Sequence, residues 1–178
     1  MTLTPMRFVA LIAAVALAAG KTCGTSGAQA QPQPQSQAIV LPDVPLVAVT
    51  SGAGVPPRPL PAQGRWVLVH IQAHCAPCEA LLSRIQADAR AIAPRLVIVV
   101  SGSAPADVGK IMTTFAGLEP AAWFADQPSV LSAALHIEET PLVLAMNDRS
   151  IRWTLAGVVW ETQRLRDVLT GWVTVPGD

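Results

Sequence analysis

The chain has 178 residues, of which 51% are hydrophobic, and its 12 lysines and arginines balance 12 aspartates and glutamates. This apolar fraction supports a buried core and excludes wholesale disorder, and a net charge of zero leaves no basic surplus for broad nucleic-acid binding. Three cysteines are too few for a four-cysteine zinc site or a disulfide-stapled miniprotein, but they allow one catalytic or redox pair.

The first 30 residues have the features of a secretory signal peptide. Arg7 supplies a positive start, residues 8–19 are an apolar run too short to span a bilayer comfortably, and residues 28–30 form an A-x-A cleavage site. An earlier small-residue site at residues 16–18 leaves the cleavage position open. We expect an exported, periplasmic or extracytoplasmic protein that begins at Gln31, or one that stays membrane-anchored where the segment is not cleaved.

Residues 31–64 are predicted to form an N-terminal extension. Residues 31–38 are polar and spaced by prolines, as in an extended spacer. Apolar alternation predicts a short strand near residues 46–49, and the proline- and glycine-rich stretch 51–64 disfavours regular structure. The compact domain is therefore expected over residues 65–178.

From Arg65 onward, short apolar runs alternate with segments of helical periodicity. Strands are expected at residues 66–71, 96–100, 121–125, 142–146 and 151–155, with Gly157 ending the last. Helices are expected at residues 77–92, 106–115, 129–136 and 161–172, the third of them capped by Ser129. This order predicts an α/β domain with a central mixed sheet flanked by helices.

Two cysteines, Cys75 and Cys78, stand where a buried strand passes into an amphipathic helix. Free N–H groups and the dipole of the helix N-terminus favour a thiolate at Cys75, and Cys78 lies one turn later, where the two can form a disulfide. Such a dithiol exchanges disulfides, with Cys75 attacking and Cys78 resolving the mixed disulfide. The alternatives are half of a zinc site, for which no second pair exists, and a static disulfide, whose short loop stabilises little.

Three stretches resemble the thioredoxin superfamily and, within it, the exported TlpA/ResA-like thiol-disulfide oxidoreductases: residues 66–78 (WVLVHIQAHCAPC), residues 140–146 (TPLVLAM) and Gly157. The resemblance implies a thioredoxin-like fold, a cis proline at Pro141 beside the two sulfurs, and a substrate groove shaped by Thr140 and Pro141. Pro141 follows the cysteine pair at a distance similar to that in the TlpA-like group, whose central insertion would correspond to residues 106–125.

The sequence departs from this family beside the cysteine pair. His74 replaces the tryptophan that commonly precedes the first cysteine, and it either tunes the Cys75 thiolate or is an exposed loop residue. Val69 and Leu81 occupy the two positions where relatives carry a proton-relaying acid, and Glu79 is expected to point elsewhere on the helix. The sequence therefore identifies no proton carrier for the second cysteine.

These features predict an exported thiol-disulfide oxidoreductase that needs no bound cofactor. The resemblance implies a monomeric reductant in cytochrome or oxidase maturation, which would act on protein dithiol or disulfide partners with electrons from a membrane dithiol carrier. The direction of electron flow stays open, because the residues between the cysteines shift the reduction potential without fixing it.

Two other classes of function stay open. A copper-binding assembly factor would use both thiolates and an imidazole from His74 or His136, although copper-delivery relatives of this fold usually space their cysteines more widely. The missing acid suggests a non-catalytic thioredoxin-like module. A thiol peroxidase is disfavoured, because Gln72 stands where its characteristic threonine would be. His70 is interpreted as a satisfied buried histidine, and His136 otherwise as a structural residue.

Overall fold

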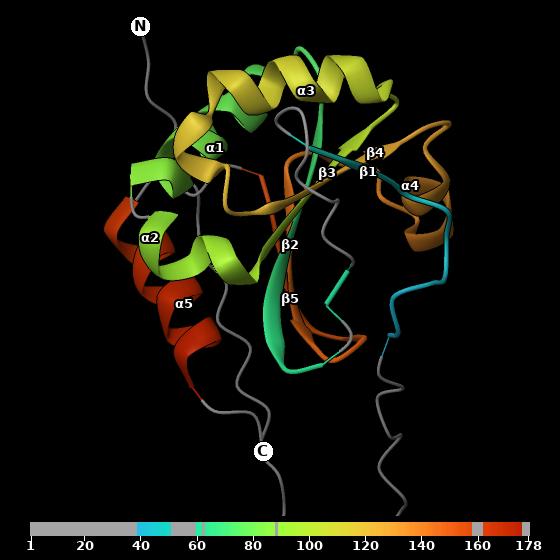
Figure 1. Cartoon of the computed structure of the whole chain (residues 1–178). Coiled ribbons are helices and arrows are strands. Elements are labelled where there is room, and N and C mark those ends of the chain that lie inside the picture. The colour runs from blue at the N-terminus through green and yellow to red at the C-terminus, as the bar shows by residue number, and fades with distance from the viewer. Residues whose placement is uncertain (1–38, 51–59, 62, 88, 158–161, 176–178) are drawn as a thin grey trace, which may run out of the picture. The chain divides into compact units, whose positions relative to one another are not determined.

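The computed structural model describes residues 39–50, 60–61, 63–87, 89–157 and 162–175. Its centre is a six-stranded sheet with the strand order β1-β4-β3-β2-β5-β6 (Figure 1). The strands are β1 Val47–Val49, β2 Arg65–Gln72, β3 Leu96–Ser101, β4 Ala122–Asp126, β5 Leu142–Asn147 and β6 Ser150–Ala156. Since β2, β3 and β4 are parallel and the other strands run antiparallel to their neighbours, the expected mixed sheet is confirmed.

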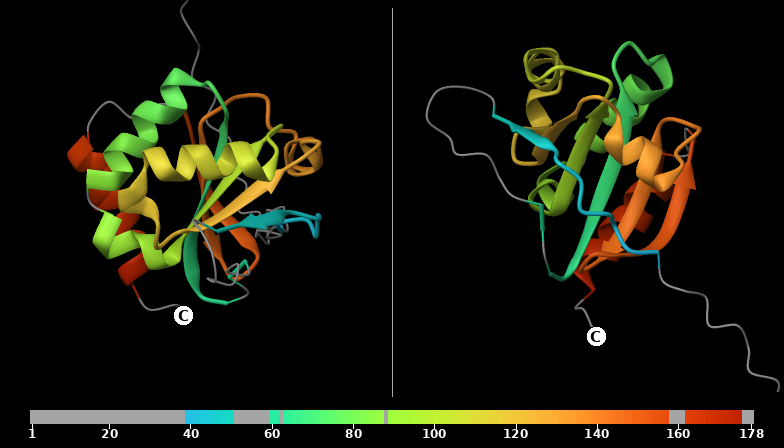
Figure 2. Two further views of the ribbon diagram at one scale, coloured as in Figure 1. Left: turned by 45° about the horizontal axis from the view of Figure 1, so that its top comes forward. Right: turned by 90° about the vertical axis from the view of Figure 1, so that its right-hand side faces the viewer.

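Helices cover both faces of this sheet (Figure 2). The helices are α1 Ala76–Ala87, α2 Ala89–Ile92, α3 Pro105–Thr114, α4 Val130–Leu135 and α5 Thr162–Thr174, with 3-10 turns η1 at Ala93–Arg95 and η2 at Ala116–Leu118. The apolar stripes of α1, α3 and α5 share one core with Val69 of β2. Leu131 of α4 belongs to a second core on the opposite face, with Leu68. β2 and β3 are nearly continuous apolar runs because both of their faces are covered.

The elements lie close to their expected positions. The helix expected over residues 77–92 is present as α1 and α2 on either side of residue 88, which is outside the described residues. Pro94 follows in η1, where its missing N–H ends the regular helix. The segment interpreted as an insertion, residues 106–125, contributes most of α3 and β4.

The predicted cap of α4 is wrong. Ser129 has a φ of 68° and makes no capping hydrogen bond. The Leu131 N–H instead donates to both carboxylate oxygens of Asp126, each at 3.2 Å. Asp126, the last residue of β4, therefore caps the helix, and its negative charge suits the positive end of the helix dipole.

Residues before Arg65 add to the sheet. The strand expected near residues 46–49 is present as β1, which pairs antiparallel with β4 from Val47↔Ala125 to Val49↔Trp123. Upstream of β1, the N–H of the buried Leu41 donates to the carbonyl of Arg149 at 2.7 Å. The described part of residues 31–64 therefore packs on the domain.

The predicted signal peptide at residues 1–30 and the spacer at residues 31–38 lie outside the described residues, so their boundaries stay predictions. Within the described ranges, every helix is too short or too polar to cross a bilayer.

Candidate active site

The two cysteines lie at the N-terminus of α1, directly after β2. His74 has a φ of 56° in the turn between the two elements, and the helix begins two residues later. A disulfide joins Cys75 to Cys78, with the Cα atoms 5.1 Å apart. The pairing expected from the sequence is therefore present.

The two cysteines differ in their surroundings. Cys78 is only 1% exposed, whereas Cys75 is half-buried. The Cys78 N–H donates to the Cys75 Sγ at 3.2 Å. A thiolate at Cys75 would keep this donor and the positive end of the helix beside it, and both stabilise negative charge. The arrangement favours Cys75 as the attacking sulfur and Cys78 as the shielded, resolving one.

A cis peptide bond joins Thr140 to Pro141, as expected. Because His70 of β2 pairs with Leu142 of β5, the end of β2 that leads to the disulfide and the start of β5 share one end of the sheet. Gly157, with a φ of 76°, donates its N–H to the Pro141 carbonyl at 2.9 Å. The three stretches that carry the family resemblance thus meet at one end of the sheet, and the groove role of Thr140 and Pro141 stays a prediction.

Apolar side chains lie on the inner side of the disulfide. Val69 and Leu81 are fully buried and belong to the same core as Cys78. Neither residue has a titratable group, so neither can relay a proton to Cys78. Glu79, expected to point elsewhere, is exposed and lines the same cavity as Cys78.

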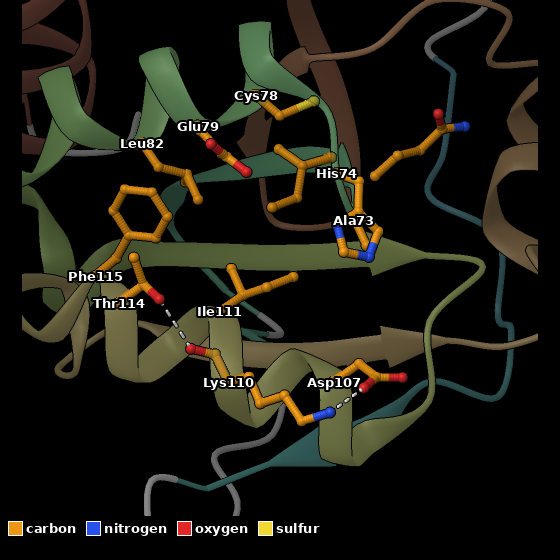
Figure 3. A pocket seen from close by; sticks show the side chains of 12 residues that line it. Ala73, His74, Cys78, Glu79, Leu82, Asp107, Lys110, Ile111, Thr114 and Phe115 are labelled. Carbon is orange, nitrogen blue, oxygen red and sulfur yellow. Dashed lines mark hydrogen bonds and ion pairs between the residues drawn. The ribbon is translucent and has the colours of Figure 1, made fainter.

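This cavity, of about 330 Å³, opens beside the disulfide between α1 and α3 (Figure 3). Its apolar lining includes Ile71, Leu82, Ile111 and Phe115. Its polar lining residues are Gln72, His74, Glu79, Asp107, Lys110 and Thr114. Asp107 and Lys110 form an ion pair at 2.8 Å, whose hydrogen bond and charge lower the pKa of Asp107 and raise the pKa of Lys110.

His74 is exposed at the edge of this cavity. In the part of the chain that the structure describes, no hydrogen bond joins its ring to the Cys75 sulfur. Tuning of Cys75 by a direct hydrogen bond is therefore not seen, and tuning by charge stays a prediction.

A second polar cluster lies on the opposite face of the sheet, and the sequence had pointed to two of its members, His70 as a buried histidine and Ser129 as a helix cap. The fully buried His70 places its Nε2 2.9 Å from the Ser132 Oγ, which lies 2.8 Å from the Ser101 Oγ. The Ser101 hydroxyl also donates to the Ser129 Oγ at 3.0 Å. Burial lowers the pKa of His70, and the charge of Asp126 opposes that shift.

His70 is thus buried as expected, but only one of its two ring nitrogens, Nε2, has a hydrogen-bond partner among the described residues. Its Nδ1 has no hydrogen-bond partner among the described residues. A buried ring nitrogen without a partner makes the charged imidazolium costly.

The copper hypothesis adds an imidazole, from His74 or His136, to the two sulfurs. His136 ends α4 in an exposed, left-handed conformation with a φ of 52°. No group of three or more His, Cys, Asp or Glu side chains suited to a metal gathers within the ranges that the structure describes. Neither His74 nor His136 therefore forms a three-ligand site with the cysteine pair there.

Comparison with known proteins defines the fold. No protein-family model and no curated protein matches this chain. A secreted Mycobacterium tuberculosis disulfide oxidoreductase, described as homologous to E. coli DsbE, matches with a TM-score of 0.51 and 14% identity over 63% of this chain and 82% of its own. A Corynebacterium glutamicum thiol-disulfide isomerase matches with a TM-score of 0.51 and 15% identity over 75% of this chain and 98% of its own.

A third solved structure, a thioredoxin-like protein in the oxidized form, matches with a TM-score of 0.55 and 16% identity over 75% of this chain and 96% of its own. The chain therefore has a thioredoxin-like fold, as the sequence resemblance implied. The Cys75–Cys78 disulfide lies on that fold at the start of α1.

Proposed function

We propose that this protein is an extracytoplasmic thiol-disulfide oxidoreductase that works through the Cys75–Cys78 pair. The observation that carries the proposal is the asymmetry of the pair: Cys75 is half-buried and accepts a helix N-terminal N–H at its sulfur, while Cys78 is buried behind it. Two structures with the same fold are described as a disulfide oxidoreductase and a thiol-disulfide isomerase, which supports this assignment.

The reaction is a pair of thiol-disulfide exchanges. The Cys75 thiolate attacks one sulfur of a partner disulfide, which forms a mixed disulfide and releases the other partner sulfur as a thiolate. The Cys78 thiolate then attacks the Cys75 sulfur, which releases the second partner sulfur and leaves the Cys75–Cys78 disulfide. The partner gains two electrons, and its two thiolates take up protons from the medium. A dithiol donor reverses the same steps to restore the reduced pair.

The reducing direction is the one we assign to the protein. The CAPC sequence, with Pro77 before the second cysteine, resembles the motifs of exported reductants. We further assign its partners to cytochrome or oxidase maturation and its electrons to a membrane dithiol carrier. The apolar segment at residues 8–19 supports an extracytoplasmic location, and the mycobacterial structure of the same fold is described as secreted.

A disulfide-reduction assay on the full chain tests the proposal. With dithiothreitol as electron donor, we expect the protein to accelerate the reduction of insulin disulfides. Cys75→Ser should abolish this activity, because the remaining sulfur of the pair, on Cys78, is only 1% exposed and is shielded from the partner. Cys23→Ser is the matched control, since it removes the one cysteine outside the pair and should leave the rate unchanged.

If the unchanged protein gives no acceleration, or if Cys75→Ser retains it, the pair is not catalytic. The thioredoxin-like domain would then be a non-catalytic module.

A further inference from the structure

The cavity between α1 and α3 has a second feature besides its position next to Cys78. Its inner wall is apolar, with Ile111 half-buried and Phe115 only 7% exposed. Its volume of about 330 Å³ lies at the lower end of the range for small-molecule sites and is large enough to admit an apolar side chain. Neither Thr140 nor Pro141 lines it, so it is separate from the predicted groove at the cis proline.

The position of the cavity connects it to the exchange reaction. Cys78 and His74, which lie on either side of Cys75 in the sequence, both line it. A protein segment that places its cysteine against the Cys75 sulfur would therefore have a neighbouring residue within reach of the cavity. The α3 wall comes from the segment interpreted as an insertion, and Figure 3 shows Ile111 and Lys110 on that side.

The charged side chains around the cavity differ in whether they have a partner of opposite charge. Asp107 and Lys110 pair with each other at 2.8 Å and so largely cancel. The carboxylate of Glu79 has no hydrogen bond or ion pair with another described residue, and Figure 3 shows it directed from α1 toward the side chains of α3. Apart from the partial positive charge of the α1 N-terminus, the side-chain charge at the rim is therefore negative, and it complements a basic group on whatever enters.

We propose that this cavity binds an apolar side chain next to the reactive cysteine of a partner protein, and that Glu79 selects a lysine or arginine beside that side chain. This inference rests on the proposed function and names the class of its partners. The partner segment is extended, presents its cysteine to Cys75, and places its apolar side chain against Ile111 and Phe115. A partner with an acidic residue at the same place is disfavoured by like charge.

Short cysteine peptides test this proposal on the oxidised full chain. One peptide carries leucine and arginine beside its cysteine, a second carries leucine and glutamate, and a third carries alanines. The measured quantity is the rate at which each peptide thiol opens the Cys75–Cys78 disulfide. Each rate is divided by the rate of the same peptide with hydroxyethyl disulfide, which removes differences in intrinsic thiol reactivity. We expect the leucine–arginine peptide to be about tenfold faster than the alanine peptide, or about 1.4 kcal/mol.

Two adjacent threonines of α3 give a matched pair of variants. Thr113 and Thr114 are both exposed, and their hydroxyls donate to the carbonyls of Gly109 and Lys110, at 2.9 Å and 3.2 Å. Only Thr114 lines the cavity, so Thr114→Phe fills it while Thr113→Phe does not. We expect Thr114→Phe to remove the tenfold preference and Thr113→Phe to keep it. Glu79→Gln should remove the preference for arginine over glutamate, and Glu138→Gln, an exposed acid outside the cavity, should keep it.

Four results would overturn the inference, and one of them also identifies failure of the proposed function. Equal normalised rates for the three peptides, or equal effects of the two threonine variants, mean that the cavity does not select partners. A change in sedimentation coefficient on Thr114→Phe without a change in selectivity means that the cavity is an interface between copies of this chain. If even dithiothreitol fails to open the Cys75–Cys78 disulfide, the exchange reaction itself is wrong.

Discussion

At the scale of single residues, burial and one hydrogen bond distinguish two chemically identical sulfurs. Cys75 is half-buried and receives the Cys78 N–H, whereas Cys78 is 1% exposed in the core with Leu81 and Val69. The first environment favours a thiolate, and the second disfavours one because it is apolar. The reactivity of the two thiols should therefore differ after reduction.

We predict that iodoacetamide modifies Cys75 of the reduced full chain about tenfold faster than Cys78, or more, near neutral pH. The lower pKa of a thiol at the helix N-terminus and its greater exposure both increase the rate. Mass spectrometry of digested samples at several times measures the two sites separately. Equal rates at the two sulfurs would contradict the assignment of attacking and resolving roles.

The role of His74 is a property of a single residue that the sequence does not determine. A histidine before the first cysteine is compatible with tuning and with simple exposure, because either role allows the same residue type. The structure gives an exposed ring at the edge of a cavity and no hydrogen bond to Cys75 among the described residues. A side-chain orientation of this kind depends on neighbours from α3 that are distant in the sequence, so periodicity cannot supply it.

At the scale of elements, the local sequence pattern correctly predicts those strands and helices whose buried residues follow the periodicity of the element itself. The apolar run at residues 66–71 becomes β2, and the helical stripe from Cys78 to Ile85 becomes the buried face of α1. The prediction that Ser129 caps α4 is wrong because Ser129 has a left-handed backbone conformation and makes no capping hydrogen bond. The carboxylate of Asp126 accepts the Leu131 N–H instead. The geometry of the cap depends on how the chain passes from β4 into α4. The general preference of serine for capping positions gives no information about that connection.

The polar cluster around His70 links β2, β3 and α4 on the face opposite the disulfide. Alternation along β2 places His70 on the side away from Val69. The sequence does not show that Ser101 and Ser132 will reach it, since these come from separate elements. The cluster leaves the Nδ1 of His70 without a partner among the described residues, and burial lowers the pKa of the ring, so the folded state favours the neutral form.

We predict that the protein loses stability as the pH falls below about 6.5, the ordinary pKa of histidine in an unfolded chain. Burial lowers the pKa of His70 in the folded state, so the unfolded state binds the extra proton first. The contribution is complete above that pH and is lost as the pH falls toward the folded-state pKa. For one proton the slope is at most about 1.4 kcal/mol per pH unit.

Urea unfolding of the oxidised chain near pH 7 and near pH 5.5 measures this effect. His70→Gln should show a smaller pH dependence than the unchanged protein, because a glutamine does not titrate. His136→Asn, at an exposed and left-handed position, is the matched control and should keep the full pH dependence. An unchanged pH dependence in His70→Gln would show that His70 is not the group responsible.

At the scale of the whole molecule, three distant stretches meet at one end of the sheet. The disulfide follows β2, the cis Thr140–Pro141 bond precedes β5, and Gly157 after β6 bonds back to Pro141. The family resemblance implies this meeting in advance, because it rests on these same stretches. The pairing of β1 with β4 and the cavity between α1 and α3 depend on contacts between distant segments, so neither follows from local patterns.

The most direct test of the account is the reduction potential of the Cys75–Cys78 pair in the full chain. The protein is equilibrated with defined thiol buffers, and the free thiols are counted by alkylation. A dedicated reductant should have a potential near or below about −250 mV, in the range of thioredoxin at about −270 mV, and this is the result we predict. A potential above about −150 mV, near the strongly oxidising DsbA at about −120 mV, would mean that the protein introduces disulfides. Failure to form the disulfide in any buffer would contradict the redox function itself.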